Sequence, residues 1–344
     1  MTTEMDMTNP LENSIRHIVG QAMGYMYSAA LRAVTLLGVA EQLVDGPRHP
    51  AELAELTGTN GPFLRRLLRY LATREVFRED EDGRFHLTPH ADILRADAPN
   101  SIKAGVLTVT SDIFWLSTGD FADAVRHGEP AFDRRYGRPF FDYLTDNPDT
   151  GVMFAEGMAS FSAGENAHII ASYEFPDSGV VVDVGGGRGG LLLEALQARP
   201  DLHGLLLDQE EVVAANILGQ LGADHRWKPV AGDFFESVPA GDLYTIKNVL
   251  HDWNDEQCVR ILRNCRDAMN PDARVLAIDA VLPPGNEAHF GKAVDIMMLL
   301  LASGQERTRP EFEQLFQSAG LRITRVIPIA GAFSLSVIEA EAAD

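Results

Sequence analysis

Val-Val-Val-Asp-Val-Gly-Gly-Gly-Arg-Gly-Gly, residues 180–190, joins an apolar run to a cluster of five glycines. Four valines in five residues are typical of a strand buried on both faces. The glycines indicate a sharp turn into a helix predicted from Leu191 to Arg199, and Pro200 ends that helix because the residue before a proline avoids helical backbone angles. The stretch therefore predicts a strand, a glycine loop and a helix, the repeating unit of parallel α/β sheets.

Short apolar runs and amphipathic segments continue to alternate after this loop, which predicts a doubly wound, Rossmann-like sheet. The tail differs, because two further strands are joined by a turn that permits an antiparallel hairpin and is too short for a helical crossover. The predicted strands cover residues 205–207, 243–247, 275–279, 321–329 and 333–339, with helices from near Glu210 and over 255–269.

The glycine loop admits two ligand classes. Gly185, Gly187 and Gly190 match the G-x-G-x-x-G pattern of dinucleotide sites, and Asp208 follows at the distance of a ribose-binding acid. Asp183, however, would repel a pyrophosphate at this place and would attract a ligand that carries an ammonium and a sulfonium group. The antiparallel final hairpin also departs from the all-parallel dinucleotide fold. A cationic nucleoside is therefore the better interpretation, and a purely structural glycine turn is the alternative.

The N-terminal third has a different pattern. Apolar residues recur at helical spacing over 14–43, and two short helices joined by a glycine turn follow over 49–58 and 61–71. A hairpin is predicted over 76–87 around the polar turn Asp-Glu-Asp-Gly, so the segment resembles a winged helix. Such a module can bind DNA or pack against another subunit, and its very apolar first helices favour burial in a homodimer.

Charge separates these two uses. The 344 residues include 29 Lys and Arg against 50 Asp and Glu, a formal charge of −21 with a pI near 4.8. Phosphate neutralisation needs a basic face, so we expect no nucleic-acid partner and no anionic membrane surface as a partner.

Length and composition predict a globular protein of more than one part. We expect a winged-helix-like dimerisation domain over 1–100, a helical linker that contributes to the active site over 101–175, and a catalytic domain over 176–344. The acidic start lacks the apolar core of a secretion signal, and the sequence has no apolar run long enough for a membrane span. Cys258 and Cys265 lie seven residues apart on a predicted helix, about 10 Å and too far for a disulfide. These features predict a cytoplasmic protein.

Four motifs together carry a resemblance to a known family. Val-Asp-Val-Gly-Gly-Gly-Arg-Gly (182–189), Gly-Asp-Phe-Phe (232–235), Ile-Lys-Asn-Val-Leu-His-Asp-Trp (246–253) and Gln-Glu-Arg-Thr (305–308) follow in order. In this order they resemble the S-adenosylmethionine-dependent small-molecule O-methyltransferases, which include plant caffeate-type enzymes and bacterial enzymes that tailor antibiotics. That family also begins with a winged-helix-like dimerisation domain, so the resemblance spans nearly the whole chain.

The resemblance implies a set of contacts with S-adenosylmethionine. Asp183, Gly185 and Gly187 match the loop that holds the methionine end of the cofactor. Asp208 matches the acid that accepts hydrogen bonds from both ribose hydroxyls, although a helix N-cap before Glu210 is the alternative role.

The other cofactor contacts implied by the resemblance come from three further segments. Asp233 and Phe234 match the pair that binds the adenine amine and packs its ring. Lys247 matches a position whose backbone meets the cofactor, and Met158 and Ser162 resemble an element of the linking helix that reaches over it.

His251 is the candidate catalytic base. A neutral phenol, with a pKa of about 10, is a poor nucleophile at neutral pH, and a neutral imidazole in reach of the hydroxyl can take its proton. The family's His-Asp-Trp histidine has this role, and packing of a loop before a helix is the alternative. The resemblance assigns Asp279 and Glu306 to orient the imidazole. Plant members usually have Glu at the first position, so Asp279 is a shorter variant there. No cluster of His, Cys and Asp residues has the spacing of metal ligands, and the family that the sequence resembles needs no metal.

The substrate is predicted only as a class. The helix over 293–301 lies where the family lines its substrate pocket, and Met297 and Met298 suit an adaptable apolar pocket for a flat ring. Phe161 and Asn248 are the other expected substrate contacts, and plain core packing is the alternative for these residues.

Three functions are therefore open. The first is O-methylation of a hydroxyl, phenolic in our interpretation, on an aromatic secondary metabolite. The second keeps the fold and cofactor for a hydroxylation, decarboxylation or rearrangement. The third is a winged-helix regulator that senses a nucleoside.

Overall fold

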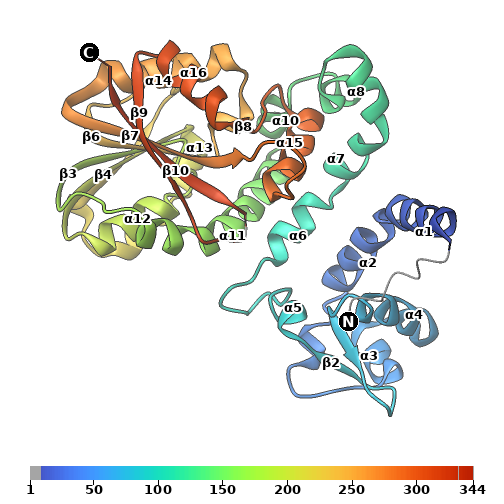
Figure 1. The fold of residues 1–344 in the computed structure, drawn as a ribbon. Helices are drawn as coiled ribbons and strands as arrows, with labels where there is room; N and C mark the ends of the chain where they lie inside the picture. Colours follow the sequence, from blue (N-terminus) through green and yellow to red (C-terminus); the bar gives the residue numbers. More distant parts are fainter. Residues whose placement is uncertain (1–8, 332, 344) are drawn as a thin grey trace. The chain divides into compact units, whose positions relative to one another are not determined.

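A computed structural model describes residues 9–331 and 333–343 (Figure 1). The chain divides into two compact units, one up to Ser111 and one from Asp112. The boundary between the units falls within the linker expected over 101–175. Its first helix, α6 (Lys103–Val109), belongs to the first unit, and its remaining helices belong to the second.

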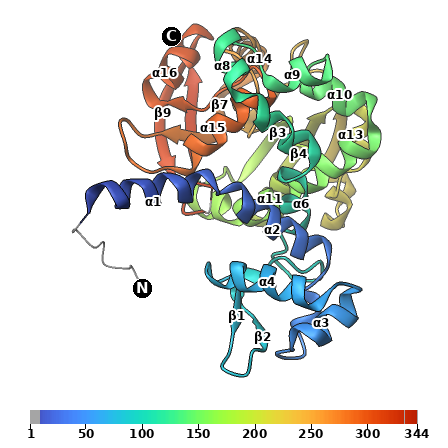
Figure 2. The same ribbon diagram turned by 90° about the vertical axis from the view of Figure 1, so that its right-hand side faces the viewer.

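The first unit has the predicted winged-helix arrangement. Strands β1 (Phe77–Glu79) and β2 (Phe85–Leu87) pair in antiparallel register, and Figure 2 shows this hairpin beside helices α3 (Pro50–Thr57) and α4 (Gly61–Ala72). Helix α3 ends at Gly58, whose φ of 63° lies in the left-handed region that favours glycine. The other helices are α1 (Pro10–Ala22), α2 (Tyr25–Leu36), η1 (Glu41–Leu43) and α5 (Pro89–Asp92).

The second unit is built on a sheet with the strand order β5-β4-β3-β6-β7-β10-β9. The first five strands pair in parallel, and β10 pairs in antiparallel register with both β7 and β9. This confirms the doubly wound sheet and its antiparallel C-terminal hairpin. The strands are β3 (Ser178–Val184), β4 (Asp201–Asp208), β5 (Trp227–Ala231), β6 (Gly241–Lys247), β7 (Met269–Leu282), β8 (Arg307–Thr308), β9 (Leu321–Pro328) and β10 (Leu335–Ala342).

Helices cover both faces of this sheet, as Figure 1 shows for α14 and α16 on one face and α11 and α12 on the other. Before the sheet come α7 (Asp112–Trp115), η2 (Ser117–Asp120), α8 (Phe121–His127), α9 (Ala131–Tyr136), α10 (Phe140–Asp146) and α11 (Pro148–Ser172). The helices that lie between strands in chain order are α12 (Gly190–Ala198), α13 (Glu210–Ala214), η3 (Leu218–Leu221), η4 (Asp224–Arg226), η5 (Leu250–Asp252), α14 (Asp255–Ala268), α15 (Phe290–Leu301) and α16 (Arg309–Ser318).

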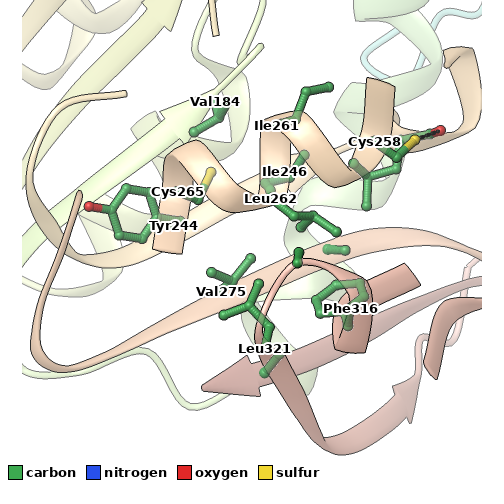
Figure 3. Close-up of a cluster of buried hydrophobic side chains, with 14 of the residues drawn as sticks. Val184, Tyr244, Ile246, Cys258, Ile261, Leu262, Cys265, Val275, Phe316 and Leu321 are labelled. Atoms are coloured by element: carbon green, nitrogen blue, oxygen red, sulfur yellow. Dashed lines mark hydrogen bonds between the residues drawn. The ribbon is translucent and has the colours of Figure 1, made fainter. Parts of the chain in front are cut away.

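Alternate residues of β3 enter two separate cores. Val182 and Val184 pack with α14 and α16, whereas Val181 packs with α11 and α12. Figure 3 shows the first core, in which Cys258 and Cys265 of α14 lie buried beside Ile261 and Leu262. Both cysteines are free, as their spacing predicts. Among the helices that the structure describes, none combines the length and the apolar character that a membrane span requires.

Candidate active site

The glycine loop follows β3 and has a backbone that only glycine adopts without strain. Gly185 and Gly187 have φ values of 65° and 59°, in the left-handed region. A Cβ atom on Gly185 would also lie 2.8 Å from a methyl group of Val249, and one on Gly186 would overlap the Asp183 carboxylate. Backbone shape and close packing therefore both require the loop's glycines.

Asp183 brings a buried carboxylate to this loop. Its Oδ1 accepts a hydrogen bond of 2.7 Å from the Thr245 hydroxyl, while its Oδ2 is buried without a partner among the described residues. Burial raises the pKa of Asp183 to about 6. A buried acceptor without a donor fits a cationic ligand group, so this site suits the ammonium or sulfonium end of S-adenosylmethionine.

Asp208 ends the neighbouring strand β4 and lies against the same loop. Its two oxygens accept hydrogen bonds of 2.8 Å from the backbone N–H groups of Gly187 and Gln209. The N-cap of α13 is Gln209, so Asp208 does not have the capping role that was its alternative. Burial raises the pKa of Asp208.

Phe234 also reaches the glycine loop. A ring atom of Phe234 lies 3.5 Å from the position of a Cβ on Gly185, and the ring meets Trp253 edge-on with 6.2 Å between centroids. Its neighbour Asp233 is exposed and accepts a 2.7 Å hydrogen bond from the N–H of Phe235. Both residues expected to meet an adenine therefore follow β5, with Phe234 at the loop.

Lys247 connects the sheet to α11 through its ammonium group. The Nζ atom donates to Oδ1 of Asn166 at 2.6 Å, and also to the hydroxyl and the carbonyl of Ser162. Burial lowers the pKa of Lys247 to about 8. Met158 lies one turn before Ser162 on the same helix, half-buried.

Asn166 was missed by sequence reasoning, although its place four positions after Ser162, on the same face of the helix, was a usable signal. The structure places its amide 3.0 Å from the position of a Cβ on Gly190, so it joins α11 to the start of α12.

His251 lies in η5, four residues after the end of β6, and its ring contacts a carboxylate. Its Nδ1 is 2.8 Å from Oε1 of Glu306, and its Nε2 is 3.6 Å from Oδ1 of Asp252. Burial alone would lower the pKa of His251. The charges of Asp252, Glu306 and Asp279 outweigh burial and raise that pKa to about 10.

Asp279 does not orient the imidazole by a hydrogen bond. It is fully buried in β7, and neither of its carboxylate oxygens has a hydrogen-bond partner among the described residues. Burial raises the pKa of Asp279 to about 7. The shorter side chain therefore acts on His251 through its charge, and Glu306 alone of the two expected acids contacts the ring. Asp252, within the quoted His-Asp-Trp motif, is the acid that sequence reasoning overlooked.

The four expected substrate contacts lie in different surroundings. Met298 is buried in α15, which agrees with the core alternative, whereas Met297 packs at the edge of an aromatic cluster. Phe161 meets Phe333 edge-on at 5.4 Å. Asn248 is exposed and has an unusual positive φ of 52° directly after β6.

An aromatic cluster adjoins the histidine turn. Phe141 of α10 stacks on Trp253 with 5.5 Å between ring centroids, and Phe154 of α11 meets Phe140 edge-on at 5.2 Å. The aromatic-rich run over 132–143 is the sequence signal for this cluster. Phe132 and Phe140 are buried within this cluster. The partly exposed Phe141 and Phe154 at its edge give the histidine turn aromatic surroundings that suit a flat substrate.

The described residues contain no group of three His, Cys, Asp or Glu side chains placed to hold a metal ion. A glycine loop with an unpartnered buried acid lies on a doubly wound sheet that ends in an antiparallel hairpin, and a carboxylate-bound histidine follows the next strand. These features together define a class I S-adenosylmethionine-dependent methyltransferase.

Comparison with known proteins agrees. An O-methyltransferase domain matches residues 119–322, and an O-methyltransferase dimerisation domain matches residues 19–97. The chain is 38% identical to the phenazine O-methyltransferase PhzM of Lysobacter antibioticus, over 92% of this chain and 93% of the relative. It is 36% identical to the mitomycin biosynthesis 6-O-methyltransferase of Streptomyces lavendulae, over 98% of this chain and 99% of that relative.

Among solved structures, the S-adenosylhomocysteine-bound form of CalO1, a methyltransferase in calicheamicin biosynthesis, superposes with a TM-score of 0.89 at 45% identity, covering 97% of this chain and 99% of that one. The chain belongs to the S-adenosylmethionine-dependent O-methyltransferase family. The predictions of family, fold class, enzyme class and cofactor are confirmed, and the alternative of a nucleoside-sensing regulator is set aside.

Proposed function

We propose that this enzyme methylates a phenolic hydroxyl of an aromatic secondary metabolite, with His251 as general base. The observation that carries this proposal is the 2.8 Å contact between His251 and Glu306 in a turn that the aromatic cluster adjoins. Bound S-adenosylmethionine supplies an electrophilic methyl group.

The charges around His251 match it to a phenol. A conjugate acid with a pKa of about 10 is close to an ordinary phenol in acidity, so proton transfer from the hydroxyl to Nε2 is nearly balanced. Glu306 holds Nδ1 and stabilises the imidazolium that forms, as in other base–carboxylate pairs. Nε2 is then the atom that receives the proton. The carboxylate of Asp252 lies 3.6 Å from Nε2, so its charge also stabilises the protonated ring.

The remaining site residues have proposed binding roles. Asp183, Gly185 and Gly187 would hold the methionine end of the cofactor and Asp208 its ribose, with Asp233 and Phe234 at the adenine. Met158, Ser162 and the backbone of Lys247 would complete that site. Phe161, Asn248 and Met297 would contact the substrate, whereas Met298 supports the pocket from the core.

Mass spectrometry of S-adenosylhomocysteine formation against a panel of phenols and naphthols tests the proposal. The wild type and the exposed-site control His225→Ala should give methylated product, and His251→Ala should turn over roughly 10²–10⁴-fold more slowly. A product that is decarboxylated, hydroxylated or rearranged without gain of a methyl group would support the second function instead.

We also propose a cytoplasmic location for the enzyme, with which its two buried free thiols, Cys258 and Cys265, are compatible.

A further inference from the structure

Arg307, next to Glu306 in the chain, has no role in the proposed chemistry. Its guanidinium group is almost completely buried, with 1% of the side chain exposed, although it carries a full charge. Such burial is costly unless every donor has a partner, so its partners indicate what the residue does.

Apart from the carbonyl of Gln305, which is 3.3 Å from Nη1, those partners lie on or beside the turn that carries His251. The Nη1 atom donates to the carbonyl of Leu250 at 2.9 Å, and Nη2 donates to the carbonyl of Trp253 at 2.9 Å. Both Nε and Nη2 donate to Oδ1 of Asp255, at 2.9 and 2.8 Å. One planar guanidinium therefore fixes the backbone on both sides of His251 and the first residue of α14.

The residues before Arg307 press on the same turn. A Cβ atom on Gly304 would overlap the carbonyl oxygen of His251 and would lie 2.6 Å from the backbone nitrogen of Trp253. Glu306 contacts the imidazole itself. Residues 304–307 thus hold the turn by its backbone and its histidine together.

We propose that Arg307 is a positioning residue for methyl transfer, which sets the distance between His251 and Glu306 by fixing the carbonyls of Leu250 and Trp253. This proposal rests on the proposed function only where it concerns turnover, because the pKa of His251 can be measured without a substrate. Lysine cannot replace Arg307 fully, since a single ammonium lacks the planar fork that reaches the carbonyls of Leu250 and Trp253 and the carboxylate of Asp255 together.

The test compares Arg307→Met, Arg307→Lys and Gly304→Ala with the control Arg309→Met, whose exposed side chain pairs with Glu313 on α16. NMR of isotope-labelled histidine, assigned with His251→Ala, reports the pKa of His251 in the presence of S-adenosylhomocysteine. In Arg307→Met and Gly304→Ala this pKa should fall towards 6.5 as the imidazole leaves Glu306, with a smaller fall in Arg307→Lys. It should stay unchanged in Arg309→Met.

Turnover on a naphthol that the wild type methylates should fall roughly 10- to 100-fold in Arg307→Met, with the affinity for S-adenosylhomocysteine unchanged. Turnover on a more acidic nitro derivative of that naphthol should fall less, because this substrate ionises without a base.

A lower melting temperature with the His251 pKa and turnover both unchanged would overturn the proposal. If Arg307→Met does not fold, wild-type values in both Arg307→Lys and Gly304→Ala would overturn it equally. If the wild type methylates no naphthol or phenol, the proposed function fails and the NMR result still decides the role of Arg307.

Discussion

At the scale of single residues, the three carboxylates near His251 determine how the enzyme responds to pH. Asp252, Asp279 and Glu306 each favour the protonated imidazole, so their charges raise the pKa of His251 and oppose loss of its proton. Only the neutral ring accepts a proton from the substrate. The value of kcat/KM should therefore rise with pH until about 10, the pKa of His251.

Glu306→Gln removes one of these negative charges and should lower the pKa of His251. The rise of kcat/KM should then move to lower pH, and the plateau should fall because the ring is a weaker base and is held by a neutral group. A pH–rate profile measures both effects, with the exposed Glu313→Gln as control. An unchanged profile in Glu306→Gln would show that Glu306 does not act on the base.

Asp208 should contribute to cofactor affinity. Asp208→Ala leaves the N–H of Gly187 and any ribose hydroxyl without an acceptor, so binding of S-adenosylhomocysteine should weaken by about 1–3 kcal/mol. Calorimetry measures this loss against Asp201→Ala, an exposed change at the other end of β4. Equal affinities in the two variants would contradict the assignment.

The candidate site was predictable where a motif names the residue. His251, Glu306, Asp183 and Phe234 follow from short patterns next to strands. Arg307 lies in a quoted motif too, but its role depends on which carbonyls the fold brings to it, and these are more than 50 positions away in the chain. Sequence spacing contains no information about that approach.

At the scale of elements, prediction depended on how strongly a segment's own residues favour one structure. Strand β3 was evident from its valines, whereas β5 was missed because Lys228 and Pro229 interrupt its apolar pattern. A proline is compatible with β5 because this strand lies at the sheet's edge, paired with β4 alone. Strand β7 is longer than predicted, since pairing with β6 extends it over polar residues at its start.

Glu339 holds the antiparallel half of the sheet together. This buried carboxylate of β10 accepts hydrogen bonds from Arg325 and Thr324 of β9, from Arg274 of β7 and from Tyr173. Burial alone would raise the pKa of Glu339, but these donors outweigh it and lower the pKa from 4.5 to about 2. Because the folded-state pKa is depressed, this stabilisation is complete above about pH 4.5 and is lost as the pH falls towards 2.

Glu339→Gln should therefore lower the free energy of unfolding by about 1–3 kcal/mol near neutral pH, and by progressively less below about pH 4.5. Urea unfolding at about pH 7 and about pH 3.5 measures the difference. Glu341→Gln, on the same strand and paired with an exposed arginine, should have little effect at either pH. A constant difference across this range would mean that the Glu339 charge does not matter.

At the scale of the whole molecule, the first unit has apolar surface that is not buried within the chain. Leu11, Ile15 and Ile18 recur at helical spacing on α1 with 68%, 54% and 64% of each residue exposed, and α1 has no buried residue. Met23 and Met26 continue the exposed surface after α1. Exposed apolar area of this kind marks an interface, and the match to a dimerisation domain begins at residue 19, directly after Ile18.

We expect a two-fold homodimer that buries this surface, with an interface above ~2,000 Å². The double change Ile15→Glu and Ile18→Glu places two charges in that interface, where they lose hydration without gaining a partner, so the dimer should dissociate at micromolar concentration. Light scattering measures the mass. Val125→Glu, on α8 and 70% exposed, is the matched control because it adds a charge to another exposed apolar position and should remain dimeric. If the double variant keeps the mass of a dimer, or the wild type has the mass of a monomer, α1 is not the interface.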